Sequence, residues 1–425
     1  MNTIFYWLQA LFSRRNYTLR NYTVFLLVLF CIQYIPVESR AGVSWVKVGV
    51  MAITACMMLK YALVNKALII AFLYALWIMM TAYALHPATF RASTVIYFFM
   101  FLITFVAFYT FVWNYHVFSL DFFINVLRRF IFVLVGVLIA QQICLIIGLK
   151  LVPILNLCQV LNRGIGANSL TFEPSTLGRL ISVLYYSYLK CNEYRRGAPL
   201  NIREVLHPNH KWVTIAYVWA VMTMGSGTAF LAMALVALYF MRGRYLFLAI
   251  PMFMGVYFIL DYFGNESFQR TVNVSQVTLT ADREQIMEVD GSAAMRIVPM
   301  VNTLNLDLSS AESWTGRGCD SVPAGGYYSK NRYMGQISDY GLISYLLDLL
   351  LIFTCCIRFL SIPTLMFFLG VGGGIGNISY GWGVLMIFTC VRFFAENYSL
   401  GYEDVDNEEQ MPIEELDVET RYECD

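Results

Sequence analysis

Two charged side chains, Glu173 and Arg179, stand at the start of a hydrophobic stretch in the segment Thr171-Phe-Glu-Pro-Ser-Thr-Leu-Gly-Arg179. A carboxylate can take a proton from an attacking hydroxyl, which makes Glu173 a candidate general base. A guanidinium binds phosphate through paired hydrogen bonds, which makes Arg179 a candidate anion ligand. Arg179 follows Glu173 by about one and a half helical turns. Because lipid disfavours a charge by several kcal/mol, we expect Arg179 to point into the protein or a wet cavity.

The same segment also has a simpler interpretation. Pro174 fits the first turn of a helix, and Ser175 could cap that helix. An acid near the positive end of a helix is stabilising whether or not it reacts with anything. For Glu173 this structural role therefore remains an alternative.

A second candidate position is the break Gly225-Ser-Gly-Thr228 between two apolar runs. Glycines permit close approach of the backbone, and the free N–H groups at a helix end suit an anion. Ser226 is accordingly a candidate for substrate binding. The alternative is a tight turn between two short helices, and the break could also lie within one interrupted helix.

A polar segment of residues 264–336 contains further cations. Its basic side chains are Arg270, Arg283, Arg296, Arg317, Lys330 and Arg332. Arg296 lies in an amphipathic stretch, Met295–Leu306, that has helical periodicity, and Arg317 lies in the Gly-rich turn Trp314–Gly318. Several arginines on one segment favour a phosphorylated ligand. A solvated loop, or contacts with lipid headgroups, would account for single members of the group.

The elements that position these residues are predicted to be membrane helices. The chain has 425 residues, of which 59% are hydrophobic and only 13% charged, against about 25% charged in a soluble domain. We predict an all-α, polytopic membrane bundle of about twelve spans. They lie at 22–37, 43–59, 66–85, 94–114, 130–151, 175–190, 212–224, 227–241, 245–263, 337–356, 360–376 and 378–394.

Alternate loops differ in charge, which predicts the orientation. The basic loops contain Arg14, Arg15, Arg20, Lys60, Lys66, Arg128, Arg129, Lys190, Arg195, Arg196, Arg203, Lys211, Arg242, Arg244 and Arg358. The positive-inside rule places these loops, and both termini, in the cytoplasm. Residues 1–395 then form one transmembrane domain whose long outer loop is 264–336. Residues 396–425 form an acidic cytoplasmic tail, which we expect to be disordered.

Composition also limits the partners and cofactors. The net charge is +1, so no basic field exists for nucleic acid. The 10 cysteines show no CxxC or Cys/His spacing, and we predict no metal and no cofactor.

The order of these motifs resembles the Wzy-type O-antigen and capsular polysaccharide polymerases, which are related to the O-antigen ligases. The resemblance covers residues 150–350. It includes Glu173–Ser175 at the start of a mid-chain span, the break Gly225–Thr228, the large loop with Ser292, Arg296 and Gly316–Gly318, and the next span opening with Tyr340–Ile343.

The resemblance implies a glycosyltransferase at the outer face of the bacterial inner membrane. Such enzymes move a growing glycan from undecaprenyl pyrophosphate to the next lipid-linked repeat unit, without a nucleotide sugar. Periplasmic arginines are thought to hold the pyrophosphate, and a chain-length regulator is a possible partner besides membrane lipid. The implied catalytic residues are Glu173, Arg179, Arg296 and Arg317. The implied substrate-binding residues are Arg163, Ser226, Lys330, Arg332 and Asp339.

Two alternatives remain open. Related ligases are thought to use a periplasmic histidine, for which the predicted topology leaves only His86. A flippase or transporter is expected to place charges along a central path through the helices. Here the charges inside spans are few, mainly Lys47, Arg179 and Asp348, with Asp261 near the end of its span.

Overall fold

The computed structural model is all-helical over the residues that it describes, namely 15–35, 44–149, 165–224, 226–241, 258, 291–319, 333–371 and 379–399. The first half contains α2 (Arg15–Cys31), α3 (Trp45–Tyr61), α4 (Lys66–Met79), the π-helical turn η1 (Met80–Leu85), η2 (Pro87–Thr89), α5 (Ala92–Trp113) and α6 (Leu120–Ile146). The second half contains α7 (Pro174–Arg196), α8 (Ile202–Val205), α9 (Pro208–Thr223), α10 (Gly227–Ala237), α14 (Gly291–Leu304), α15 (Ala311–Thr315), α16 (Ile337–Cys355), α17 (Ile362–Val371) and α18 (Ser379–Ser399).

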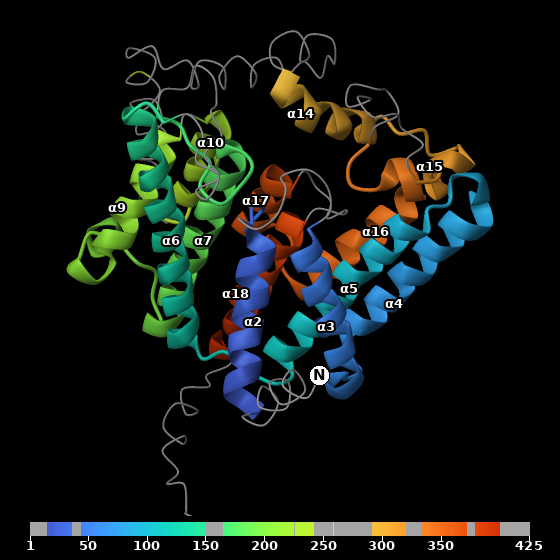
Figure 1. The fold of residues 1–425 in the computed structure, drawn as a ribbon, viewed down its shortest axis with the longest axis horizontal. Helices are drawn as coiled ribbons and strands as arrows, with labels where there is room; N and C mark the ends of the chain where they lie inside the picture. Colours follow the sequence, from blue (N-terminus) through green and yellow to red (C-terminus); the bar gives the residue numbers. More distant parts are fainter. Residues whose placement is uncertain are drawn as a thin grey trace, which may run out of the picture.

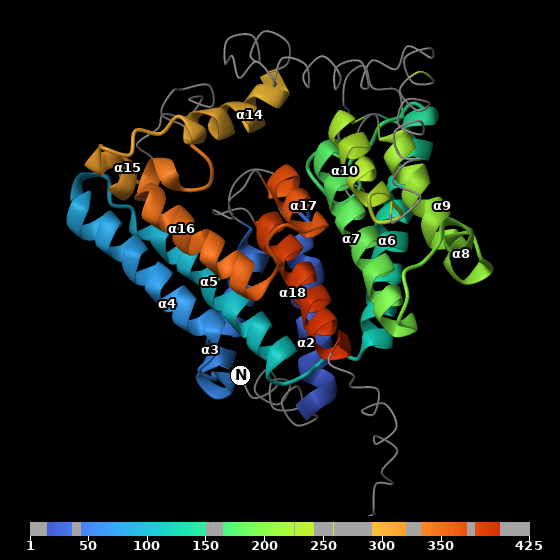
Figure 2. The same ribbon diagram turned by 180° about the vertical axis from the view of Figure 1, so that it is seen from behind.

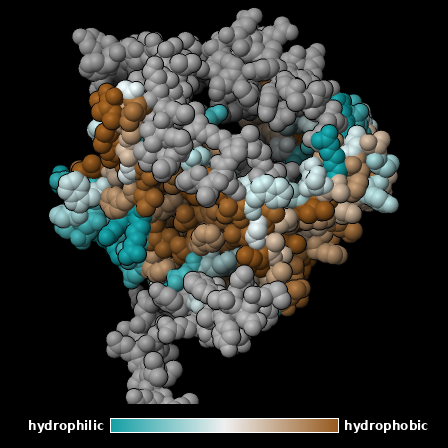
Figure 3. Space-filling model, in the orientation of Figure 1, coloured by the Kyte–Doolittle hydropathy of each residue, from teal (hydrophilic) through white to brown (hydrophobic). Residues whose placement is uncertain are grey.

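Within the described residues, four stretches of helix are long and apolar enough to cross a membrane. They are Lys66–Leu85, Ala92–Trp113, Leu120–Ile146 and Ile337–Cys355. Hydrophobic residues cover the middle of the face drawn in Figure 3. Leu59 and Phe72 are 90% and 66% exposed, which suits contact with lipid rather than water. Membrane character is thus supported, whereas twelve spans and the long outer loop remain predictions.

Some helix ends differ from the predicted spans. α6 begins at Leu120 rather than near 130, because Ser119 is its N-cap and accepts a hydrogen bond from the N–H of Phe122 at 3.4 Å. Polar residues lower the local hydropathy, which shortens a predicted span, but they do not end the helix. For the same reason α18 continues to Ser399, past the predicted domain boundary at 395. The predicted span 245–263 lies outside the described residues except for Phe258, and the acidic tail beyond Ser399 lies outside them entirely.

The helices pack around α18, which contacts α2, α5 and α7 (Figures 1 and 2). Trp382 of α18 is fully buried, and its ring is parallel to that of Phe101 at 6.2 Å. We call the end of the bundle at which α7 begins, drawn at the top of Figure 1, the upper end. The opposite end, where α7 finishes, is the lower end.

Two of the predicted intramembrane charges are buried inside the bundle. Lys47 is 3% exposed, and its Nζ donates to the carbonyl of Ile32 at 2.6 Å. That carbonyl directly follows α2, whose carboxyl end carries partial negative charge, so the ammonium stabilises the end of the helix. Asp348 of α16 is 1% exposed. Asp261 lies outside the described residues.

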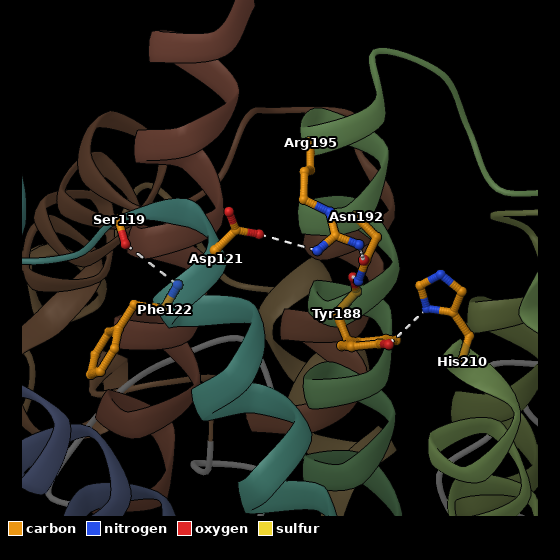
Figure 4. A network of polar contacts seen from close by, with 7 residues as sticks. All are labelled: Ser119, Asp121, Phe122, Tyr188, Asn192, Arg195 and His210. Carbon is orange, nitrogen blue, oxygen red and sulfur yellow. Dashed lines mark hydrogen bonds and ion pairs between the residues drawn. The ribbon is translucent and has the colours of Figure 1, made fainter. Parts of the chain in front are cut away.

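Polar contacts join α6, α7 and α9 at the lower end (Figure 4). Arg195 bridges Asp121 at 3.1 Å and the amide oxygen of Asn192 at 2.8 Å. One helical turn away, the Tyr188 hydroxyl lies 2.7 Å from Nδ1 of His210. These contacts fix α6 and α9 antiparallel to α7, and they lie in the region that the charge rule assigns to the cytoplasm.

The His210 contact predicts that acidification destabilises the lower end. Burial lowers the pKa of His210 below its ordinary value of about 6.5, and the nearby charges of Arg195, His207 and Arg196 lower it further, opposed by Glu204. The unfolded chain then binds a proton before the folded chain does, so stability is lost as the pH falls through 6.5. We expect the melting temperature to drop between pH 7.5 and 5.5, and to drop less for His210→Gln. An equal drop in both proteins would contradict this assignment.

Candidate functional site

The start of α7 holds the first group of predicted site residues. Glu173 is the N-cap residue and Pro174 the first helical residue. The expectation that Ser175 caps the helix is wrong, because Ser175 lies inside the first turn. Its hydroxyl instead donates to Oε2 of Glu173 at 2.9 Å. Glu173 is exposed, whereas Ser175 is 8% exposed, so the serine holds the acid at the surface of the bundle.

Arg179 turns back toward the upper end, as helical side chains tilt toward the amino terminus. Its Nε donates to the carbonyl of Ser175 at 3.0 Å, and one terminal nitrogen donates to the hydroxyl of Thr176 at 3.1 Å. The guanidinium carbon lies 5.9 Å from the centre of the Tyr380 ring. The side chain is half-buried between α7 and α18. The expectation that Arg179 faces the protein rather than lipid agrees with these contacts.

The break after residue 224 separates two short helices. The alternative of a single interrupted helix is therefore excluded. α10 runs alongside α7, because the Thr228 hydroxyl approaches the Ser175 carbonyl at 3.5 Å. Ser226 is the N-cap residue of α10 and is 4% exposed, and its hydroxyl lies 3.0 Å from that of Thr228. A methyl group at Gly178 would collide with Ala229, so the two helices touch here. The structure thus brings Ser226 next to the start of α7.

Among the described helices that begin at the upper end, α10 and α18 each contact α7. Each helix start carries partial positive charge from its free N–H groups. Arg179 adds a full positive charge among them. We call Glu173, Ser175, Arg179, Ser226 and Tyr380 the Arg179 cluster. Its electrostatics favour an anion, and its exposed rim provides one carboxylate.

Arg317 belongs to a second group, built where α15 meets α16. The N–H of Arg317 donates to the carbonyl of Ser338, and the N–H of Gly318 donates to that of Asp339, both at 3.0 Å. These bonds bring two predicted site residues, Arg317 and Asp339, together. The guanidinium of Arg317 forms an ion pair with Glu312, so its charge is partly compensated. We call residues Trp314–Gly318 the Arg317 turn.

The two groups are built on different helices. α15 and the start of α16 lie on one side of the upper end, and α7 and α10 lie on the other, with α17 and α18 between them (Figures 1 and 2). Arg179 and Arg317 thus belong to helices on opposite sides of α17 and α18. Arg296 lies on α14, and nothing is described of its side chain. Arg163, Lys330 and Arg332 lie outside the described residues.

Sequence reasoning did not identify Tyr380. An aromatic residue in an apolar run gives no signal that distinguishes a site residue from the core. His86, the one histidine predicted outside, adjoins the Arg317 turn, because a methyl group at Gly318 would approach its Cβ to 2.9 Å. Within the described residues, no three His, Cys, Asp or Glu side chains are placed to hold a metal ion.

Comparisons with models of protein families, with curated proteins and with solved structures found no match to this chain.

Proposed function

We propose that the protein is a polysaccharide repeat-unit polymerase of the bacterial inner membrane. It transfers a growing glycan from undecaprenyl pyrophosphate to the next lipid-linked repeat unit at the outer face. The proposal rests on the resemblance of residues 150–350 to such polymerases. The structural observation that supports it is the Arg179 cluster, a cationic position at one end of an apolar helical bundle.

The chemistry of the transfer matches the charge of the cluster. The acceptor oxygen bonds to the anomeric carbon of the donor glycan while the bond from that carbon to the pyrophosphate oxygen breaks. The electron pair of the broken bond leaves with the pyrophosphate, whose growing negative charge needs fixed positive partners. Arg179 and the starts of α7, α10 and α18 supply positive charge in one place.

Glu173 is the proposed general base. It accepts the proton that the acceptor hydroxyl loses as the new glycosidic bond forms. Its carboxylate stands at the rim of the cluster, where a sugar hydroxyl can reach it from the aqueous side. The hydrogen bond from Ser175 holds the carboxylate in one orientation, which favours a defined direction of proton transfer.

The separate Arg317 turn suits the second substrate of the same reaction. The acceptor is also a lipid pyrophosphate, and it keeps that group throughout. Its attacking hydroxyl lies at the far end of an oligosaccharide from its pyrophosphate, so the two pyrophosphates need positions apart from each other. We therefore assign Arg179 to the donor and Arg317, with Asp339, to the acceptor. Arg296, Arg163, Lys330 and Arg332 remain proposed contacts.

The proposed function predicts the phenotype of a deletion. A strain that lacks the gene should carry single repeat units on its surface lipid and no ladder of longer chains. Electrophoresis of the extracted glycolipid separates these outcomes, and the intact gene on a plasmid should restore the ladder.

Each alternative activity predicts a different result. Loss of even the single unit would contradict polymerisation and favour a flippase. Long chains that accumulate on the lipid carrier, without transfer to the final acceptor, would favour a ligase.

A further inference from the structure

Tyr380 is the second residue of α18 and carries a buried hydroxyl. The residue is 3% exposed, and its hydroxyl oxygen has no hydrogen-bond partner among the described residues. A buried donor without a partner costs the folded state about 1–3 kcal/mol. Phenylalanine would fill the same space without that cost. Packing alone therefore does not explain why this residue is a tyrosine.

The surroundings of this hydroxyl indicate what would bind it. Arg179 lies over the Tyr380 ring, with 5.9 Å between the guanidinium carbon and the ring centre. An oxygen atom of a ligand seated beside the ring edge could accept a hydrogen bond from both side chains. Both lie at the end where α7, α10 and α18 begin, and the partial positive charge of these three helix starts favours an anion. A phenol can donate to an oxyanion without adding charge of its own.

We propose that the Tyr380 hydroxyl donates a hydrogen bond to the pyrophosphate of a lipid carrier, jointly with Arg179. This inference rests on the proposed function, because it names a further binding residue of the donor site. Arg179 supplies charge and Tyr380 supplies direction, since a hydroxyl donates along a single line. A donor shielded from water binds an anion more strongly than an exposed one, because the local dielectric constant is low.

One substitution distinguishes a role of the hydroxyl in ligand binding from a role in the stability of the fold. Tyr380→Phe removes the hydroxyl and keeps the ring that Arg179 covers. Because the hydroxyl has no hydrogen-bond partner among the described residues, its loss should leave the melting temperature unchanged or raise it. The loss of a hydrogen bond to a charged oxygen should weaken ligand binding about 10- to 100-fold. A residue that served packing alone would show the two effects in the same direction.

The test uses the full-length purified protein in nanodiscs, with farnesyl pyrophosphate as the probe and farnesol as the control for the tail. Wild type, Tyr380→Phe and Tyr185→Phe are titrated and melted in parallel. Tyr185 is the matched control, since it is a buried tyrosine of α7 whose hydroxyl lies 3.0 Å from that of Thr214, away from the Arg179 cluster.

We expect Tyr380→Phe to bind farnesyl pyrophosphate about 10- to 100-fold more weakly than wild type. Tyr185→Phe should bind as wild type does. Equal binding by wild type and Tyr380→Phe would overturn the inference, as would binding of farnesol as tight as that of farnesyl pyrophosphate. Neither result would change the deletion phenotype that the proposed function predicts. Conversely, an unchanged ladder after deletion would remove the proposed function, even if the tyrosine were shown to bind.

Discussion

Arg179→Met should abolish the ladder of long chains while the protein still accumulates in the membrane. Methionine keeps much of the length and apolar character of the arginine stem, so the packing between α7 and α18 is largely preserved. What it removes is the fixed cation beside the proposed leaving group. Removal of one preorganised partner of a developing anion typically slows a reaction about 100- to 1000-fold. Electrophoresis of surface glycolipid and an immunoblot of the membrane fraction measure the two quantities.

The same helix provides the control for this substitution. Arg195 is also on α7 but at the lower end, where it pairs with Asp121 and is 48% exposed. An exposed pair of this kind contributes about 0–1 kcal/mol, so Arg195→Met should keep the ladder. Arg179→Lys tests geometry, because an ammonium retains the charge and loses the planar pair of donors. A normal ladder from Arg179→Met would exclude the residue from the reaction.

Local features of the site were predictable from sequence. Hydropathy and turn residues place the start of α10 at Gly227 and that of α16 at Ile337, because both depend on neighbours within a few positions. The cost of a charge in lipid likewise predicts that Arg179 faces the protein. The amphipathic stretch Met295–Leu306 coincides with most of α14 for the same reason.

The arrangement of the helices around one another was not predictable in this way. Hydropathy gives the order of spans along the chain and does not say which spans are neighbours in space. The separation of Arg179 from Arg317 follows from such packing, since α17 and α18 lie between α7 and α15. Tyr380 was missed for a related reason. Its significance comes from the arginine of another helix and from an unused hydroxyl, neither of which leaves a mark in the sequence.

The separation of the two groups also makes the role of each open to test independently. Substitutions at Arg179 should act on the donor, whose carbon–oxygen bond breaks. Changes at the Arg317 turn should act on the acceptor, whose pyrophosphate stays intact. Because the two groups lie apart and share no partner among the described residues, the effects of single substitutions on the rate of chain growth are expected to add, as free energies, in the double variant.

Gly341→Ala should detach the Arg317 turn from α16. Gly341 has φ +79° and ψ 175°, a conformation that is essentially restricted to glycine. A methyl group there would also collide with the backbone of Trp314 and Thr315, and one at Gly316 would collide with the backbone of Asp339 and Gly341. Strain and collision together should lower the free energy of unfolding of this region by about 3 kcal/mol or more. We expect a lower melting temperature and a shortened ladder, because the turn no longer holds Arg317 beside Asp339.

The matched control for Gly341→Ala is the same change at Gly49, in the interior of α3. No atom lies within 4 Å of a methyl group at Gly49, and alanine favours the helix over glycine by about 1 kcal/mol. Gly49→Ala should therefore melt at or above the wild-type temperature and keep a full ladder. A wild-type melting curve for Gly341→Ala would contradict the contact between the turn and α16. A full ladder from a destabilised Gly341→Ala would instead remove the Arg317 turn from acceptor binding, and would leave the donor site at Arg179 as the only proposed pyrophosphate position in the described residues.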